Sequence, residues 1–363
     1  SSKTVKGTQY QRERYDLSYG LKTNSGEFLI FAGRHNVANS GTPALAMDII
    51  NVNTDMAGFN LTSNLDSSIV NHLNIAFSWA DVNHGMDNYS LRTQPAMGPR
   101  HNQANAENLA WSVDVQLPLA TSELKLGVDG NDQSHNSVVT NPENSHFKIN
   151  NFVDSERDSL GAFAEFNGNH DKWNYQVGYR HNRIELNSDE VGAMMGHMHM
   201  GDMHDAMSAM QTKPCDGMQS CATQLSDAFN QSQRSINFNT NNLVINLNRA
   251  LNKGTVLTID LGIKQRAPFY RETFLWLPMS ITGGLADGRN YTGNLALKPE
   301  TSREINLGLN KKTNNFTIQP QVFYRSIDNY IQGVPSNNSI ANQFSQDMSN
   351  MHHGMNHMGH NDK

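Results

Sequence analysis

Long apolar runs are missing from this chain. Only 37% of its 363 residues are hydrophobic, and the mean hydropathy is −0.59. A helix that crosses a bilayer needs about 20 consecutive apolar residues, so helical membrane spans are excluded. Transmembrane β-strands are not excluded, because a barrel strand needs an apolar residue only at every second position.

The chain also lacks the patterns of nucleic-acid binding and of catalysis. Its net charge is −6, and no basic stripe is interleaved with aromatic residues, so we expect no nucleic-acid partner. Gly-x-Ser-x-Gly, a Gly-rich phosphate loop and His-Glu-x-x-His are all absent. Glu165 and Arg180 lie in alternating segments and are expected to be lumen charges rather than an acid–base pair. We therefore expect no enzymatic activity.

Cysteine is scarce: the chain has only Cys215 and Cys221, in the polar stretch Cys-Asp-Gly-Met-Gln-Ser-Cys. We expect thiols this close to form a small disulfide, which requires an oxidising compartment. Two free thiols, or two soft metal ligands, are the alternatives. The first residues are polar and do not form a signal peptide.

Period-two alternation is the dominant positive signal. Trp111, Val113 and Val115 alternate with polar residues, and this pattern is typical of a strand with one apolar and one polar face. On this basis we expect Trp111, Trp173 and Tyr175 to face lipid near the interfacial belts. Strands are predicted at 8–20, 26–34, 54–63, 69–80, 109–119, 123–130, 158–167, 172–185, 236–249, 254–264, 302–311 and 315–327.

The connections between these segments alternate in length. Short turns near 22–25, 64–68, 120–122, 167–171, 250–253 and 312–314 alternate with long connections at 35–53, 81–108, 131–157, 186–235, 265–301 and from 328 onward. An up-and-down meander places all the short turns on one rim and all the long loops on the other, as in outer-membrane barrels. A soluble β-sandwich or a propeller is the alternative, but no blade-length repeat is present.

The sequence therefore predicts an all-β fold, an antiparallel up-and-down transmembrane β-barrel. The chain begins directly in a strand and ends in a polar tail rather than in an aromatic-ended strand. We accordingly expect residues 1–363 to be one section of a larger barrel, with long extracellular loops and without a plug domain.

Methionine and histidine are concentrated in two of the predicted loops, 191–218 and 348–360. Together these stretches hold 12 of the 17 methionines and 7 of the 15 histidines, so the clustering exceeds drift in composition. Apart from Met218, the first supplies as candidate ligands Met194, Met195, His197, Met198, His199, Met200, Met203, His204, Met207 and Met210. The second supplies Met348, Met351, His352, His353, Met355, His357, Met358 and His360.

Methionine usually fills hydrophobic cores, but here its sequence neighbours are Gly, Asp, Asn and Ser, which argues against a core role. Thioethers suit Cu(I), whereas imidazole suits Cu(II), Zn and Ni alike. The methionines therefore favour copper, and a position at the barrel entrance suits capture. A low-complexity loop without a specific ligand is the alternative.

A third candidate site is His84 with Met86, just after a predicted strand. Residues i and i+2 of an extended segment point the same way, so both side chains can reach one metal ion. His-x-Met alone is a weak signal, and an ordinary loop histidine is the simpler interpretation.

Three stretches resemble TonB-dependent copper receptors of Gram-negative outer membranes. They are residues 83–92 (Asn-His-Gly-Met-Asp-Asn-Tyr-Ser-Leu-Arg), residues 40–49 (Ser-Gly-Thr-Pro-Ala-Leu-Ala-Met-Asp-Ile), and residues 274–300, from Phe-Leu-Trp-Leu-Pro to Leu-Lys-Pro-Glu. The resemblance spans roughly residues 1–335. It implies a 22-stranded barrel closed by an N-terminal plug, with import driven by TonB.

The resemblance also implies that His84 and Met86 bind copper together with a Cys-x-x-x-Met pair on the plug. That pair is absent here: Cys215 precedes Met218 at a different spacing and in an outer loop. No TonB box is recognisable either.

Copper import across the outer membrane is the leading functional hypothesis. A receptor for a metal chelate or another organic ligand is the second, with Tyr270, Arg271, Phe274 and Trp276 as candidate ligand-binding residues. A surface barrel that sequesters metal without transporting it is the third.

Overall fold

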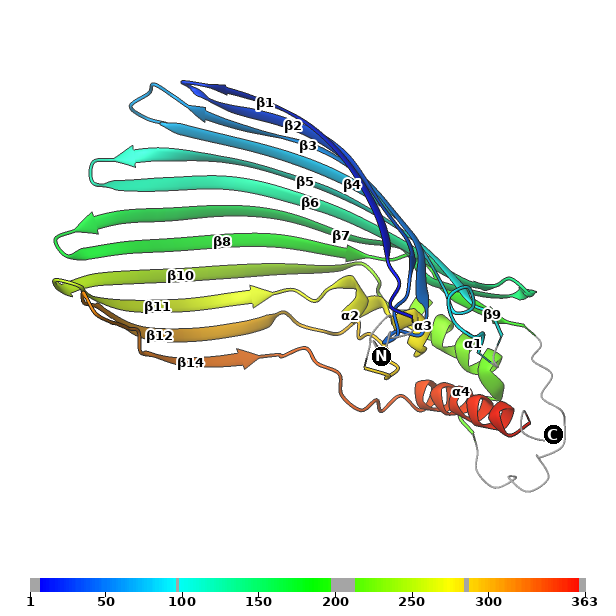
Figure 1. The fold of residues 1–363 in the computed structure, drawn as a ribbon. Helices are drawn as coiled ribbons and strands as arrows, with labels where there is room; N and C mark the ends of the chain where they lie inside the picture. The colour runs from blue at the N-terminus through cyan, green and yellow to red at the C-terminus, as the bar shows by residue number, and fades with distance from the viewer. Residues whose placement is uncertain (1–6, 96–97, 197–212, 284–286, 359–363) are drawn as a thin grey trace.

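One curved antiparallel sheet forms the framework, and most of its strands pair with the next long strand along the chain (Figure 1). The computed structural model describes residues 7–95, 98–196, 213–283 and 287–358. The main strands are β1 (Gln11–Thr23), β2 (Gly26–Ser40), β3 (Asp48–Asn64), β4 (His72–Asp87), β5 (His101–Leu119), β6 (Ser122–Asn141), β7 (Asn144–His170), β8 (Trp173–Asn187), β10 (Ile236–Asn252), β11 (Thr255–Arg266), β12 (Glu300–Lys312), β13 (Thr317–Ile318) and β14 (Gln321–Asp328). This architecture confirms the predicted up-and-down barrel section.

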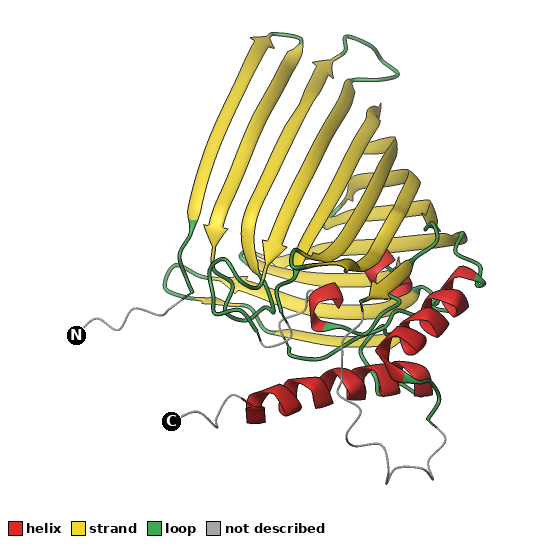
Figure 2. Cartoon of the chain, turned by 90° about the vertical axis from the view of Figure 1, so that its right-hand side faces the viewer, coloured by secondary structure: helices red, strands yellow, loops and turns green. Residues whose placement is uncertain are grey.

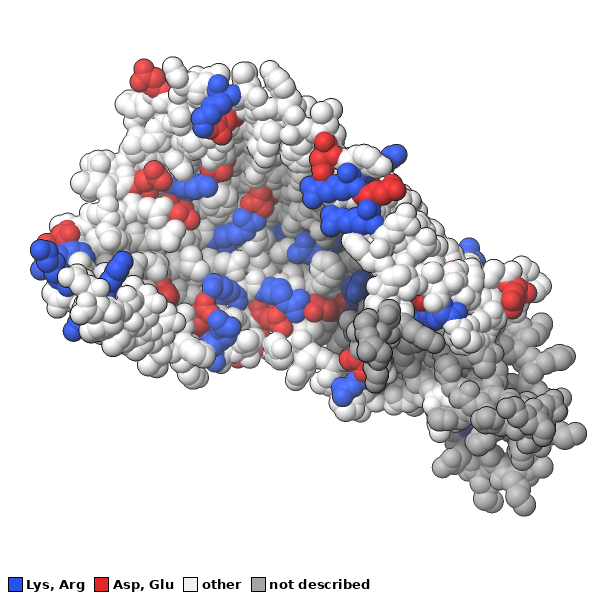
Figure 3. Space-filling view, viewed as in Figure 1, with Lys and Arg blue, Asp and Glu red and all other residues white. Residues whose placement is uncertain are grey.

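Two chemically different faces follow from the strand register. Residues directly opposite each other share a face, so Ile30, Phe59, Phe77 and Trp111 form one apolar row across β2 to β5. The other face is hollow and carries charged side chains (Figure 3). The same alternation places Trp111, Trp173 and Tyr175 on the convex, apolar face, as the lipid-facing prediction requires.

Short turns lie at the end of the sheet opposite to the helices (Figure 1). Several have only two residues outside the strands: 24–25, 120–121, 171–172 and 253–254. Such turns need left-handed backbone, which Ala120, Asp171 and Gly254 adopt. A Cβ on Gly254 would lie 2.3 Å from the Lys312 carbonyl oxygen. These short turns share one rim, as predicted, but the connection between β6 and β7 on the other rim departs from the predicted pattern.

The prediction of a long loop at 131–157 is wrong. β6 and β7 continue through it and leave only residues 142–143 as a turn. The loop predicted at 81–108 likewise shrinks to residues 88–100, because β4 and β5 extend into it. The cause is physical: these strand ends carry polar residues on the convex face too, so hydropathy no longer alternates although the backbone stays extended.

Among the described residues, four helices occur in the long connections, where no helix was predicted. They are α1 (Gly217–Asn230), α2 (Tyr270–Phe274), α3 (Ser280–Gly283) and α4 (Ser339–Met358). All gather at one end of the sheet, beside the short strand β9 (Gly192–Met195) (Figures 1 and 2). None of the described helices is both long and apolar enough to cross a bilayer.

A hydrophobic cluster joins the helices to the concave face of the sheet. It combines Phe147, Ile149 and Leu186 from the strands with Cys221 and Leu225 of α1. Phe344 and Met348 of α4 also belong to this cluster. The segment around α2 and α3 is held on β7, where the Trp276 indole donates to the Asn150 carbonyl at 3.1 Å.

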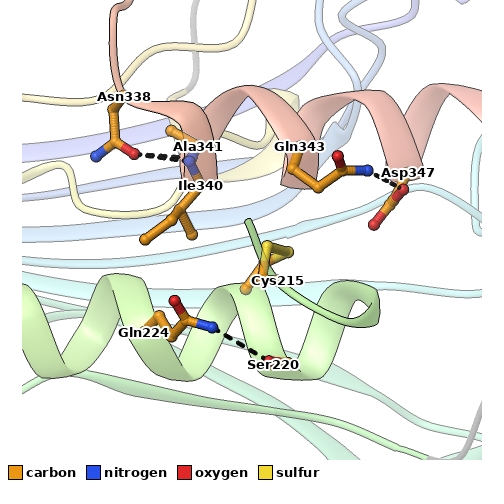
Figure 4. Close-up of a disulfide and its surroundings, with 9 residues drawn as sticks. Cys215, Ser220, Gln224, Asn338, Ile340, Ala341, Gln343 and Asp347 are labelled. Carbon is orange, nitrogen blue, oxygen red and sulfur yellow. Dashed lines mark hydrogen bonds between the residues drawn. A yellow bond between two sulfur atoms is a disulfide. The ribbon is translucent and has the colours of Figure 1, made fainter. Parts of the chain in front are cut away.

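Cys215 and Cys221 form a disulfide, with their Cα atoms 5.2 Å apart, which is the pairing favoured from the sequence. Both residues are buried in the cluster, Cys215 at 4% and Cys221 at 0% exposure. The bond lies between α1 and α4 (Figure 4). It therefore fixes the start of the helix on which α4 packs.

Replacing both cysteines with serine is expected to destabilise α1 locally by about 2 kcal/mol, because a short loop is no longer closed in the open state. Amide hydrogen exchange along α1 should then accelerate by about 30-fold. Asp227→Asn, on the exposed side of α1, is the matched control and should leave exchange unchanged. Equal exchange in the serine variant and the control would contradict a stabilising role.

Candidate metal-binding site

His84 and Met86 lie on the concave face of β4, near the end that carries the helices. Val52 and Ala104 flank His84 on the neighbouring strands, and Ile49 and Asn102 flank Met86 in the same way. The two side chains are two residues apart on one strand, so they share a face, as the sequence predicted. The extension of β4 to Asp87 is what brings this pair into the sheet.

The imidazole of His84 has an unused nitrogen. Its Nε2 atom is buried and has no hydrogen-bond partner among the described residues. An unsatisfied buried polar atom of this kind is unfavourable and requires an explanation. Met86 lies next to it along the strand and packs against the hydrophobic cluster. A neutral imidazole nitrogen and a thioether in this position are two ligands suited to copper.

The remainder of the 83–92 stretch holds the loop that follows β4. The Asp87 carboxylate accepts hydrogen bonds from the backbone amides of Tyr89 and Ser90, at 3.1 and 2.9 Å. The side-chain oxygen of Asn88 accepts a hydrogen bond from the backbone amide of Arg100 at 2.7 Å. This bond closes the loop onto the start of β5. Sequence inspection did not identify these positioning roles.

Arg92 clamps this loop to the neighbouring one. Its Nε donates to Asp48 at 2.7 Å, and its Nη1 donates to the Leu45 carbonyl at 2.8 Å. The bond to Asp48 raises the pKa of the Arg92 guanidinium. Residues of the 40–49 and 83–92 stretches are thus in direct contact.

The first Met/His-rich stretch begins on β9. Met194 is 52% exposed, whereas Met195 is 2% exposed and belongs to the hydrophobic cluster. The backbone amide of Met195 donates to Gln219 of α1 at 2.6 Å. His197, Met198, His199, Met200, Met203, His204, Met207 and Met210 lie outside the described residues.

The second stretch is helical. Met348 is 7% exposed and packs in the same cluster as Met195. Met351, His352, His353, Met355, His357 and Met358 follow on α4, and His360 lies outside the described residues. The expectation that these methionines lack apolar neighbours is therefore wrong for Met195 and Met348. The helices supply partners that are distant in sequence.

The two stretches start from a common support. α1 contacts both β9 and α4, and the disulfide ties Cys221 of this helix to Cys215, which lies just before it. Residues from two loops that are more than a hundred positions apart are therefore anchored to the same helix. This agrees with the prediction that both stretches lie on one rim.

The aromatic residues considered for an organic ligand are largely unavailable. Phe274 and Trp276 are 1% and 4% exposed and belong to the core. Tyr270 packs against Phe152, and His135 lies 5.2 Å from it between ring centroids. Burial raises the pKa of the Tyr270 hydroxyl. Only Arg271 of this group is exposed.

The concave wall further from the rim holds structural ion pairs. Arg180 binds Asp129 at 2.6 Å through two nitrogens, and Glu165 accepts from Gln176 at 2.9 Å. These contacts agree with their assignment as lumen charges. Across the described part of the chain, no group of three or more His, Cys, Asp or Glu residues could hold a metal ion.

Comparisons with known proteins bear on this arrangement. A model of the TonB dependent receptor-like β-barrel matches residues 1–351. No curated protein matches the sequence.

Among solved structures, the copper transporter OprC is similar at a TM-score of 0.64 and 14% identity, covering 88% of this chain and 45% of that one. The Serratia marcescens hemophore receptor HasR has a TM-score of 0.57 at 13% identity, covering 88% and 46%. The ferric yersiniabactin uptake receptor FyuA from Yersinia pestis has a TM-score of 0.53 at 10% identity, covering 88% of this chain and 45% of that one.

The chain thus spans about half the length of these solved proteins. At such identities the structural likeness establishes the fold alone. The family match covers nearly the whole chain, and it agrees with the polar hollow, the apolar convex face and the segregated loops. The chain belongs to the TonB-dependent receptor β-barrel family of the Gram-negative outer membrane.

Proposed function

We propose that this protein imports copper across the outer membrane. The observation that carries the proposal is the unpaired, buried Nε2 of His84 beside Met86 on the concave face. Copper here is the cargo, and the two side chains are part of a defined site at the mouth of the barrel. OprC, a similar fold, is described as a copper transporter, which supports the choice of metal.

The Met/His-rich stretches would gather the ion before it reaches this site. Thioethers bind Cu(I) in preference to Zn(II), whereas imidazoles discriminate weakly. Anchoring on α1 keeps the two stretches at the outer rim, where metal arrives. In this scheme His84 and Met86 give selectivity, and the outer stretches give capacity.

Transport would require further parts. Two ligands leave the coordination of copper incomplete, so we infer that a plug segment supplies the remaining ligands. Coupling to TonB in the inner membrane would release the ion inward. A barrel that only sequesters metal would need neither part.

A chelate receptor is the second candidate function. Receptors for heme and for ferric yersiniabactin share the fold, and exposed Arg271 suits an anionic ligand. Burial of Phe274 and Trp276 weakens this alternative, because they cannot form an accessible aromatic surface.

Equilibrium titration of the full-length protein, plug included, tests the proposal. We expect one tight Cu(I) site that excess Zn(II) does not displace, together with several weaker sites. Ferric chelates and heme should not compete. Tight binding of a chelate with only weak Cu(I) binding would instead establish the second candidate.

A further inference from the structure

Five asparagines form one continuous row across adjacent strands. Asn36 of β2 lies opposite Asn53 of β3, which lies opposite Asn83 of β4. The row continues through Asn105 of β5 to Asn136 of β6. Asparagine is depleted in strands, so five in register on one face require an explanation beyond strand formation.

The row lies on the convex face. Asn83 is an even number of residues from Phe77 and Trp79 on the same strand, so it shares their face. His84, by contrast, points into the hollow. The asparagines are therefore separate from the proposed copper site and turn away from the barrel interior.

The upper edge of the lipid-facing band can be located between Trp79 and Glu107. The indole Nε1 of Trp79 donates to the Glu107 carboxylate at 2.7 Å. A tryptophan with its ring beside apolar residues and its N–H bonded to a charge is typical of the membrane interface. Arg34 and Asp55 form an ion pair with two hydrogen bonds, and they lie in the same cross-strand row as Glu107.

The asparagine row lies well above this edge. Asn83 follows Trp79 by four residue positions, which is about 13 Å along an antiparallel strand. With a strand tilt of about 40°, the height is about 10 Å. The polar layer of an ordinary bilayer is only about 5–8 Å thick on each side. The row is therefore above phospholipid headgroups, at the level of a taller headgroup.

Part of the row's hydrogen-bonding capacity is unused, although Asn83 donates to Asp81, Asn105 accepts from Gln103 and Asn136 is bonded to Asp154. In the part of the chain that the structure describes, the Asn36 and Asn53 side chains form no hydrogen bond. Asn53 and Asn105 are exposed. Each amide offers two donors and one acceptor oxygen, which matches the mixed donor and acceptor character of sugar hydroxyls.

We propose that the convex asparagine row binds the sugar portion of a glycolipid in the outer leaflet. Its continuity with the lipid-facing band identifies a membrane lipid as the occupant, and its height selects a lipid whose headgroup carries sugars. The neutral amides bond hydroxyls, and the Arg34–Asp55 row below them faces the base of the headgroup.

Lipopolysaccharide binding by the purified full-length protein in detergent tests this proposal. The combined change Asn53→Ala and Asn105→Ala should weaken binding of core-sugar-bearing lipopolysaccharide by about tenfold. Binding of lipid A, which lacks the core sugars, should be unchanged. Asn60→Ala, on the concave side of β3, is the matched control, and Asn53→Gln with Asn105→Gln should keep most of the affinity.

Three results would overturn the proposal. Unchanged affinity for the sugar-bearing lipid would remove the role of the amides. An equal loss with lipid A alone would assign the contact to the lipid base. A change of oligomeric state in the alanine variant, without loss of lipid binding, would show that a second copy of the protein covers this face.

Discussion

Replacing His84 with alanine and Met86 with leucine should abolish the tight Cu(I) site. Loss of a residue that merely orients a metal ligand typically reduces affinity by 10–100-fold, so loss of two direct ligands should exceed about 100-fold. The folded barrel should survive, because His84 forms no hydrogen bond through Nε2 and leucine conserves the volume of methionine. The measurement is Cu(I) titration with a competing chelator.

Two control variants separate this site from general loss of copper binding. Met56→Leu removes a thioether from the concave face of β3, and His181→Ala removes an imidazole from the convex face of β8. Neither residue is near the pair, so both variants should keep the tight site. Binding should also weaken in acid, because protons compete with metal for the imidazole nitrogen. A tight site that persists in the double variant would exclude the pair as ligands.

The barrel could be predicted because its signal is local. Alternation around Trp111 and the two-residue turns are set by neighbouring residues, and both were confirmed. The ends of β6 and β7 were missed because they project beyond the lipid-facing band. There the convex face carries Asp132 and Asn136 instead of apolar residues, so the alternation disappears from hydropathy while strand pairing continues.

The helices were missed for a different reason. α4 does show apolar residues at helical spacing, Ile340, Phe344 and Met348, and this signal was present in the sequence. The methionine-rich composition of the segment instead favoured the prediction of a metal-binding loop. Its partners on α1 are more than a hundred residues away, so the burial of Met348 depends on tertiary contacts that no local pattern reveals.

The site shows the same division between local and distant information. The shared face of His84 and Met86 follows from strand geometry and was predictable. The contact between Arg92 and Asp48 joins residues 44 positions apart, and no spacing rule identifies it. Strand pairing between β3 and β4 brings these two loops together.

Replacing the outer methionines with leucine should weaken the low-affinity Cu(I) sites while sparing the tight site. The set to change is Met198, Met200, Met203, Met207, Met210, Met351, Met355 and Met358. Met195 and Met348 are left in place because they are buried in the core. Leucine removes the sulfur at similar volume, so the weak Cu(I) sites should lose about tenfold in apparent affinity.

Zn(II) binding provides the internal comparison for this variant. The histidines of both stretches remain, and imidazole binds Zn(II) readily, so Zn(II) affinity should stay within about twofold. Met47→Leu with Met279→Leu is the matched control, since both residues are buried in the cluster and should contribute no accessible thioether. If Cu(I) capacity is the same in the eight-residue variant and in this control, the outer stretches are not copper ligands, and capture must then rest on the His84 site alone.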